Sequence, residues 1–295
     1  MAGTSQKNKL KSGIVVLIGR PSVGKSTLLN AILGQKISIT SPRPQTTRFP
    51  IQGLYNDERG QILFIDTPGI FEKVQDQVSR KINPLAEKET GKADVVLYVV
   101  DQTRKPGSEE AKILGIIRKV NKPKILVVNK IDIQSPSYEP FYSPQEEECQ
   151  KKIKVSALYG KHVKALVSAI FEFLPKGKLF IEPENIISPA FNLTPEKFIA
   201  EIIREKAFLI ARKEVPYTLT VKVEELSERD KGNFYIKATI YVLDDRYKKM
   251  IIGEKGRTIK NIGSQARKEL EIITGQPVFL DLWVETNKHW PEMFL

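Results

Sequence analysis

The sequence contains few cysteines and histidines and no long apolar run. It has one cysteine, Cys149, and two histidines among 295 residues. A disulfide within the chain is therefore excluded, and a structural zinc site is not expected. No run of about 18 apolar residues occurs, so no membrane-spanning helix is expected. Residues 1–13 lack the apolar stretch of a signal peptide, and the expected compartment is the cytoplasm.

Basic residues outnumber acidic ones. Lys and Arg number 47 and Asp and Glu 35, which gives a formal net charge of +12. This surplus favours a polyanionic partner, nucleic acid first and an anionic membrane surface second, over a merely soluble basic surface. Hydrophobic residues make up 41% of the chain, enough for ordinary cores. At roughly 100–200 residues per domain, the length predicts two domains.

The first half of the chain alternates apolar runs with helical patterns. Strands are predicted at 14–19, 61–66, 94–101, 124–130 and 152–157, and helices at 25–33, 109–120 and 163–174. This alternation predicts an α/β fold with a mainly parallel sheet. Prolines interrupt the pattern within 174–189, so we place the boundary there and expect domains at 1–178 and 179–295.

The second half follows another order. Its elements are predicted as a helix at 195–211, alternating strands at 217–226 and 234–243, a short basic helix, the loop 253–256, a helix at 257–273 and a strand at 278–284. The strands are expected to pair antiparallel in an α+β domain. Trp283 and Trp290 are expected to be core anchors rather than stacking platforms.

GRPSVGKS, residues 19–26, lies between a predicted strand and a predicted helix. In that setting GxxxxGK[ST] predicts a loop whose backbone N–H groups surround phosphates. Lys25 would supply charge to the β- and γ-phosphates, and the Ser26 hydroxyl would bind Mg²⁺. The candidate nucleotide-binding residues of this loop are Gly19, Arg20, Pro21, Ser22, Val23, Gly24, Lys25, Ser26 and Thr27.

NKID, residues 129–132, indicates guanine rather than adenine. The Asp132 carboxylate can accept hydrogen bonds from guanine N1–H and the exocyclic amine, whereas adenine offers neither donor there. Asn129 would brace the loop, and the Lys130 stem would lie along the ring. In SAL, formed by Ser156, Ala157 and Leu158, the Ala157 N–H is expected to reach guanine O6. The predicted ligand is therefore GTP or GDP.

DTPG, formed by Asp66, Thr67, Pro68 and Gly69, follows another predicted strand. Asp66 would hold Mg²⁺ through water, and the Gly69 N–H would contact the γ-phosphate. The segment 35–53 reads as a mobile loop, from which Thr46 or Thr47 would reach the ion, and we prefer Thr47. The predicted metal set is Ser26, Thr47 and Asp66.

GEKG, residues 253–256, lies between two predicted helices and among basic side chains. Glycines allow an RNA backbone to approach closely, and helix N-terminal amides can face phosphate. The alternative is a helical turn with a solvated basic face. The candidate RNA-binding residues are Lys248, Lys249, Ile252, Gly253, Glu254, Lys255, Gly256, Arg257 and Lys260.

The order GRPSVGKS, QTTR, DTPG, NKID, SAL resembles the translation-factor-like GTPases, and IIGEKG resembles the loop of a type II KH domain. A GTPase joined to a C-terminal KH domain resembles the Era family over nearly the whole chain. The resemblance implies a P-loop GTPase domain followed by a type II KH domain. It also implies a GTP-hydrolysing switch that binds the 3′ end of small-subunit ribosomal RNA, assists assembly of the pre-30S particle and contacts the inner membrane face peripherally. We expect a monomer.

Two positions bear on the mechanism implied by this resemblance. Ser22 stands where most Era loops have an asparagine that holds potassium in related GTPases, so potassium dependence is not inferred. Ile70 follows DTPG where Ras-type enzymes carry a water-orienting glutamine. Slow intrinsic hydrolysis with no side-chain general base is therefore expected. A membrane-surface regulator and an RNA-binding scaffold with little turnover are the alternative functions.

Overall fold

The computed structural model describes residues 10–44, 46–71, 77–186, 188–211, 214–229 and 232–294. The chain divides into two compact units, Met1–Asn192 and Leu193–Leu295. Among the described residues, no helix has both the length and the apolar character needed to cross a membrane.

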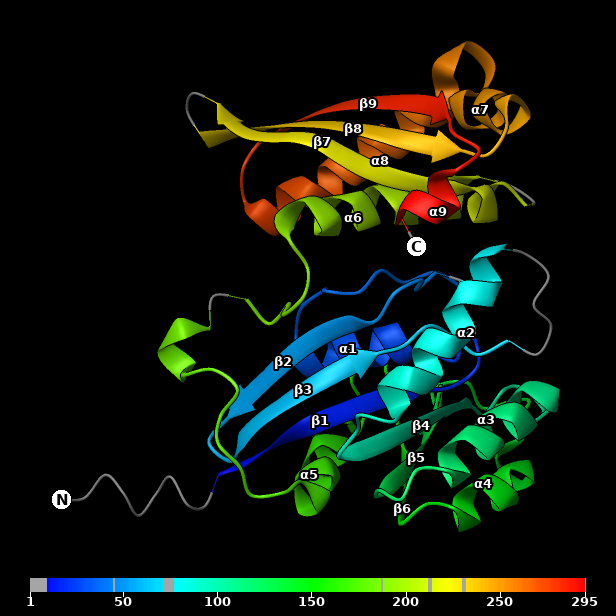
Figure 1. Cartoon of the computed structure of the whole chain (residues 1–295), viewed down its shortest axis with the longest axis vertical. Helices are drawn as coiled ribbons and strands as arrows, with labels where there is room; N and C mark the ends of the chain where they lie inside the picture. The colour runs from blue at the N-terminus through cyan, green and yellow to red at the C-terminus, as the bar shows by residue number, and fades with distance from the viewer. Residues whose placement is uncertain are drawn as a thin grey trace. The chain divides into compact units, whose positions relative to one another are not determined.

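The first unit is built on a six-stranded sheet (Figure 1). Its elements are β1 (Lys11–Ile18), α1 (Lys25–Leu33), β2 (Ile51–Asp57), β3 (Gly60–Asp66), α2 (Gln77–Thr90), β4 (Val95–Asp101), α3 (Ser108–Arg118), β5 (Lys124–Asn129), α4 (Ser143–Glu147), β6 (Lys151–Lys154) and α5 (Val163–Phe173). The strand order is β2-β3-β1-β4-β5-β6, with only β2 antiparallel to its neighbour. The predicted mainly parallel α/β sheet is confirmed.

The central strands place the functional loops. β3, β4 and β5 are buried along their whole length and β1 along most of it, as their continuous apolar sequences require. Because the four strands are parallel, their carboxyl ends meet at one edge of the sheet. The loop after β1, the DTPG segment, Asp101 and NKID therefore gather at that edge.

The first unit extends further along the chain than the boundary expected after residue 178. The segment after that residue is attached to the first unit, because the Gln61 side chain of β3 bonds to the backbone of Phe180 and Ile181. Further along, Leu54 N–H donates to Pro189 O at 2.7 Å, alongside an antiparallel bridge between Gly53 and Ala190. These bonds explain why the compact units divide after Asn192 instead.

The second unit has a three-stranded sheet with its two longest helices, Pro195–Ile210 and Arg257–Thr274, along one face (Figure 1). Its elements are α6 (Pro195–Ile210), β7 (Leu219–Arg229), β8 (Asn233–Val242), α7 (Asp245–Ile252), α8 (Arg257–Thr274), β9 (Val278–Thr286) and α9 (Trp290–Phe294). In the order β7-β8-β9, the first pair is antiparallel, as expected, and the second is parallel. Thr194 caps α6 by accepting from Lys197 N–H, and Pro195 is its first residue.

The two tryptophans have different surroundings. Trp290 is fully buried, and its indole N–H donates to Thr218 O at 2.9 Å, so it is the expected core anchor. Trp283 lies on β9 with 54% of its surface exposed, which corrects the expectation that it belongs to the core. Its neighbours Leu282 and Val284 are less exposed, because alternate residues of a strand face opposite sides of the sheet.

Candidate functional site

The loop from Gly19 to Ser26 connects β1 to α1 along a path that two glycines permit. A Cβ at residue 19 would lie 2.4 Å from Val99 O, and one at residue 24 would lie 2.3 Å from Asn129 Nδ2. Gly24 also has a φ of 96°, in the region that side chains disfavour. The backbone can therefore pass close to β4 and β5 and present the N-terminus of α1 to an anion.

Lys25 and Arg20 have different surroundings in this loop. Lys25 is buried, and its Nζ donates to the Gly19 and Arg20 carbonyls at 3.1 and 2.9 Å. Burial lowers the pKa of Lys25 to about 8, against the opposing attraction of Asp66, and a bound phosphate would favour its charged form. The Arg20 guanidinium instead binds Glu109 and Glu110 of α3 at 2.7 and 2.8 Å, which fixes the loop to that helix.

The three predicted metal ligands lie close together at the end of the phosphate loop. Ser26 Oγ donates to Asp66 Oδ2 at 2.6 Å and lies 3.0 Å from Thr47 Oγ1. Thr46 instead donates to Arg43 O at 2.8 Å, so Thr47 is the threonine nearer the other two. The structure adds Ser38, whose hydroxyl donates to Asp66 Oδ2 at 3.0 Å and which no sequence motif indicated.

These oxygens fit a hard cation. Asp66 Oδ1 is buried and has no hydrogen-bond partner among the described residues. Burial raises the pKa of Asp66, because it disfavours the charged carboxylate. A cation beside this oxygen would stabilise the charged form. One carboxylate with hydroxyls suits Mg²⁺, which takes its remaining ligands from water and substrate phosphates. The described residues contain no group of three or more His, Cys, Asp or Glu side chains that would indicate another metal centre.

The DTPG segment packs tightly against the phosphate loop. A Cβ on Gly69 would lie 2.6 Å from Pro21 Cα, so only glycine fits there. Thr67 Oγ1 donates to Leu17 O at 2.7 Å, and Ile70 N–H donates to Gly19 O at 3.3 Å. The Ile70 side chain is fully buried in the apolar core with Ile18 and Ile65. It therefore cannot orient an attacking water.

Asn129 joins the NKID loop to two other loops. Its Nδ2 donates to Val23 O at 2.8 Å, and its Oδ1 accepts from Ala157 N–H at 3.0 Å. The Ala157 N–H expected to reach guanine O6 is thus bonded to Asn129 in this structure. Asp132 Oδ1 accepts from Ser156 Oγ at 2.5 Å, which orients the carboxylate predicted to select guanine. Leu158 is largely exposed beside it.

Two further residues, Asp101 and Gln102, support this loop. Lys130 Nζ donates to Asp101 Oδ2 at 2.6 Å and to Ser22 O at 3.1 Å. The Gln102 side chain donates to Lys130 O at 3.2 Å and to Ile133 O at 2.7 Å. No sequence motif indicated either residue. The signal that could have identified them is their position at and just after the end of a predicted parallel strand, beside the phosphate loop.

In the second unit, GEKG forms a tight turn between α7 and α8. Gly253 and Gly256 have φ values of 71° and 76°, and a Cβ on Gly253 would lie 2.2 Å from Thr258 Oγ1. Lys249, Glu254, Lys255, Arg257 and Lys260 are exposed around the turn, whereas Lys248 and Ile252 are half-buried. The loop therefore presents backbone and positive charge together.

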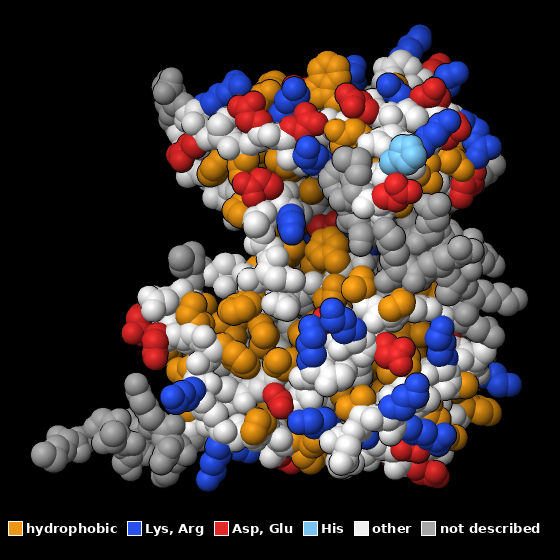
Figure 2. All heavy atoms as spheres, viewed as in Figure 1, with side chains coloured by type: hydrophobic (Ala, Val, Ile, Leu, Met, Phe, Trp, Pro, Cys, Tyr) orange, Lys and Arg blue, Asp and Glu red, His pale blue; other side chains and the backbone are white. Residues whose placement is uncertain are grey.

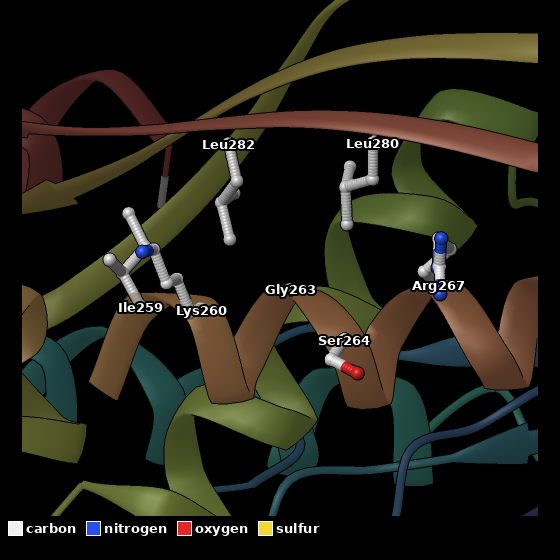
Figure 3. Close-up of a pocket in the computed structure, with 7 residues that line it drawn as sticks. All are labelled: Ile259, Lys260, Gly263, Ser264, Arg267, Leu280 and Leu282. Carbon is white, nitrogen blue, oxygen red and sulfur yellow. The ribbon is translucent and has the colours of Figure 1, made fainter. Parts of the chain in front are cut away.

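A groove of about 310 Å³ lies between α8 and β9 (Figure 3). Leu280 and Leu282 of β9 point into it and toward α8. The lining residues on the α8 side are Ile259, Lys260, Gly263, Ser264 and Arg267. Apolar walls with basic side chains suit a nucleic-acid base and its phosphate. Lys260 was a sequence candidate, whereas no motif indicated Gly263 and Ser264 of α8 or the two leucines of β9.

Both units match known families. Residues 14–130 match the family described as 50S ribosome-binding GTPase, and residues 214–291 match the KH domain. GTPase Era of Halothermothrix orenii is 42% identical over 96% of this chain and 95% of its own. GTPase Era of Aquifex aeolicus is 40% identical over 95% of each.

Two solved structures of Era proteins are also similar to this chain over nearly its whole length. A crystal structure of Era in complex with MgGDPNP and nucleotides 1506–1542 of 16S ribosomal RNA has a TM-score of 0.87 and 38% identity, covering 96% of this chain and 95% of that one. A variant of Aquifex aeolicus Era bound to GDP·AlF4⁻ has the same TM-score and identity, covering 96% of both chains. Since the similarity in sequence extends through both units, the chain belongs to the Era family of GTPases.

Proposed function

We propose that this protein is a GTP-hydrolysing switch that binds the 3′ end of small-subunit ribosomal RNA and assists small-subunit assembly. The observation that carries the proposal is the pairing of a nucleotide site in one unit with a basic, apolar-walled groove in the other. A relative with 38% identity was crystallised with MgGDPNP and nucleotides 1506–1542 of 16S ribosomal RNA, which supports both ligands.

In the first unit, the chain itself binds and orients the nucleotide. The loop amides and Lys25 would hold the phosphates, while Asp132 accepts hydrogen bonds from guanine. Ser26, Thr47 and Asp66 would hold Mg²⁺, which supplies charge neutralisation at the phosphates when bound. Because Ile70 is buried, water must be positioned by backbone or loop groups, and hydrolysis is expected to be slow.

In the second unit, the GEKG turn and the groove would bind different parts of the RNA. The GEKG backbone would receive the phosphates with Lys255 and Arg257, and the space between Ile259 and Leu282 would receive bases. In the GTP-bound state, ordering of the segments around Thr47 and Gly69 would alter how RNA is held.

Two variants test the proposal and control for each other. Asp132→Ala should lose the preference for GTP over ATP yet keep its affinity for an oligonucleotide matching the 3′ end of 16S ribosomal RNA. Gly253→Asp should lose RNA affinity yet bind GTP normally, because the new side chain would meet Thr258 and add a negative charge to the turn. Retained nucleotide selectivity in the first variant, or normal RNA affinity in the second, would refute the matching half of the proposal.

The monomeric state and the peripheral membrane contact stay predictions. Light scattering of the purified protein measures the first, and flotation with anionic vesicles measures the second. Crosslinking of the GTP-bound protein to cellular RNA tests the ribosomal target, for which we expect a peak at the 3′ end of the small-subunit RNA.

A further inference from the structure

The face of the second unit's sheet opposite its helices carries exposed aromatic rings. Phe279 and Trp283 alternate on β9 with residues that face the helices, and 63% and 54% of their surfaces are exposed. Single exposed apolar side chains are ordinary, but two large rings on one strand face are not. Both lie outside the groove, whose β9 residues are Leu280 and Leu282.

Carboxylates alternate with these rings. Asp281 and Glu285 share the outward face of β9, which therefore reads ring, carboxylate, ring, carboxylate along Phe279, Asp281, Trp283 and Glu285. Among the described residues, neither carboxylate has a basic group within 4 Å. Lys237 lies opposite Asp281 in the sheet register, but its nearest carboxylate is Glu224, at 3.9 Å. We call these four residues of β9 the outer strip.

Beside one end of the outer strip, a guanidinium already lies on a ring of the neighbouring strand β8. Tyr235 stacks on Phe279 with ring centroids 5.8 Å apart and an interplanar angle of 15°. Arg229 lies over the Tyr235 ring, 3.7 Å from its centroid. The face therefore shows the cation–π geometry that a basic ligand would use on Trp283.

We propose that the outer strip binds an extended, arginine-rich segment of a protein partner. Alternate residues of an extended chain repeat at about 6.5–7 Å, which matches the spacing of alternate positions on β9. Guanidinium groups at alternate positions would then meet a ring and a carboxylate in turn, so that one stacks on the ring and the next pairs with the carboxylate. RNA is the less suitable occupant, because its phosphates would meet Asp281 and Glu285. In Figure 2, acidic side chains lie among the basic ones on the second unit, so its surface is not uniformly basic.

The test uses the full chain and a short synthetic peptide of alternating arginine and serine. Binding should change the fluorescence of exposed Trp283, whereas buried Trp290 serves as a constant background. Anisotropy of a labelled peptide should show Trp283→Leu binding roughly threefold to thirtyfold weaker, and Asp281→Asn with Glu285→Gln weaker still. Phe141→Ala and Glu147→Gln, which change an exposed ring and an exposed carboxylate of the first unit, should leave peptide affinity unchanged.

Two results would overturn the proposal. One is peptide affinity that is equal in the wild-type chain, Trp283→Leu and the carboxylate double variant. The other is loss of affinity for the ribosomal oligonucleotide in Trp283→Leu, which would make the outer strip an RNA surface. Normal GTP binding and an unchanged unfolding midpoint establish that each variant is folded.

Discussion

Single side chains hold the loops of the nucleotide site together. Asn129 bonds to the phosphate loop and to the SAL loop, while Lys130 bonds to Asp101 and to the Ser22 carbonyl. The NKID loop is thus fixed to the phosphate loop by two of its own residues. The bracing role of Asn129 was predicted from the sequence, whereas the individual partners, which are the Ala157 N–H, two backbone carbonyls and Asp101, become clear only in the fold.

Asp101→Asn should loosen Lys130 and speed nucleotide release. The ion pair at 2.6 Å would become a weaker bond from the Lys130 ammonium to an uncharged amide oxygen, and GDP dissociation should become about tenfold faster. Stopped-flow release of a fluorescent GDP analogue measures this rate. Asp57→Asn is the matched control, because Asp57 pairs with Arg59 in the β2–β3 hairpin, outside the candidate site. Equal release rates in the two variants would contradict the role of Asp101.

Ile70→Gln should destabilise the first unit without speeding hydrolysis. The side chain occupies an apolar core, so a buried amide would cost about 2–4 kcal/mol of unfolding free energy. Ile70→Val, the apolar control, should cost about 1 kcal/mol. Urea unfolding followed by far-UV circular dichroism gives both values, and single-turnover assays give the hydrolysis rate. Faster hydrolysis in Ile70→Gln would mean that this position can reach the attacking water.

Elements that follow one regular hydrophobic pattern could be predicted from the sequence, whereas elements that depend on tertiary contacts could not. β1, β3, β4 and β5 have the continuous apolar runs of buried parallel strands. β2 is an antiparallel edge strand with Gly53 inside it, and part of it was assigned to a loop. α2 was missed because Pro84 lies within it and its composition is polar.

The same distinction between local sequence and tertiary contacts applies to the residues of the candidate sites. The loops at 19–26, 66–69, 129–132 and 253–256 carry local motifs and were predicted from them. Ser38, Gln102 and the groove residue Gly263 act through neighbours far away in the sequence. No sequence motif marks them, because their partners become adjacent only when the sheet and helices pack.

The two glycines of the GEKG turn should differ in their tolerance of alanine. At Gly253 a methyl group would lie 2.2 Å from Thr258 Oγ1 in a left-handed backbone, so Gly253→Ala should distort the turn. Gly256→Ala meets only Lys260 Cε at 4.0 Å and should cost about 1–2 kcal/mol through its φ alone. Urea unfolding followed by Trp290 fluorescence reports on this unit, and an equal loss in both variants would refute the steric argument.

For the whole molecule, the charge surplus predicts a salt-sensitive association with RNA. If the turn and groove neutralise three or four phosphates, log affinity should fall with log salt with a slope of roughly −2 to −3. Filter binding of the oligonucleotide over a salt series measures the slope. Lys255→Gln should make it shallower by about one unit or slightly less, whereas Lys197→Gln on α6 is the matched control. A slope that is the same for both would exclude Lys255 from phosphate contact.

The stretch that ends the first unit also protects an open sheet edge. β2 lies at the edge of its sheet, and residues 189–192 occupy the backbone groups of its first half: Phe191 N–H donates to Gln52 O, and Gln52 N–H donates to Asn192 Oδ1. Uncovered strand edges template pairing between molecules. A first unit produced without residues 179–192 should therefore self-associate through β2, while one that ends at Asn192 should remain dispersed. The same few residues that lead into the second unit thus protect the first unit against aggregation.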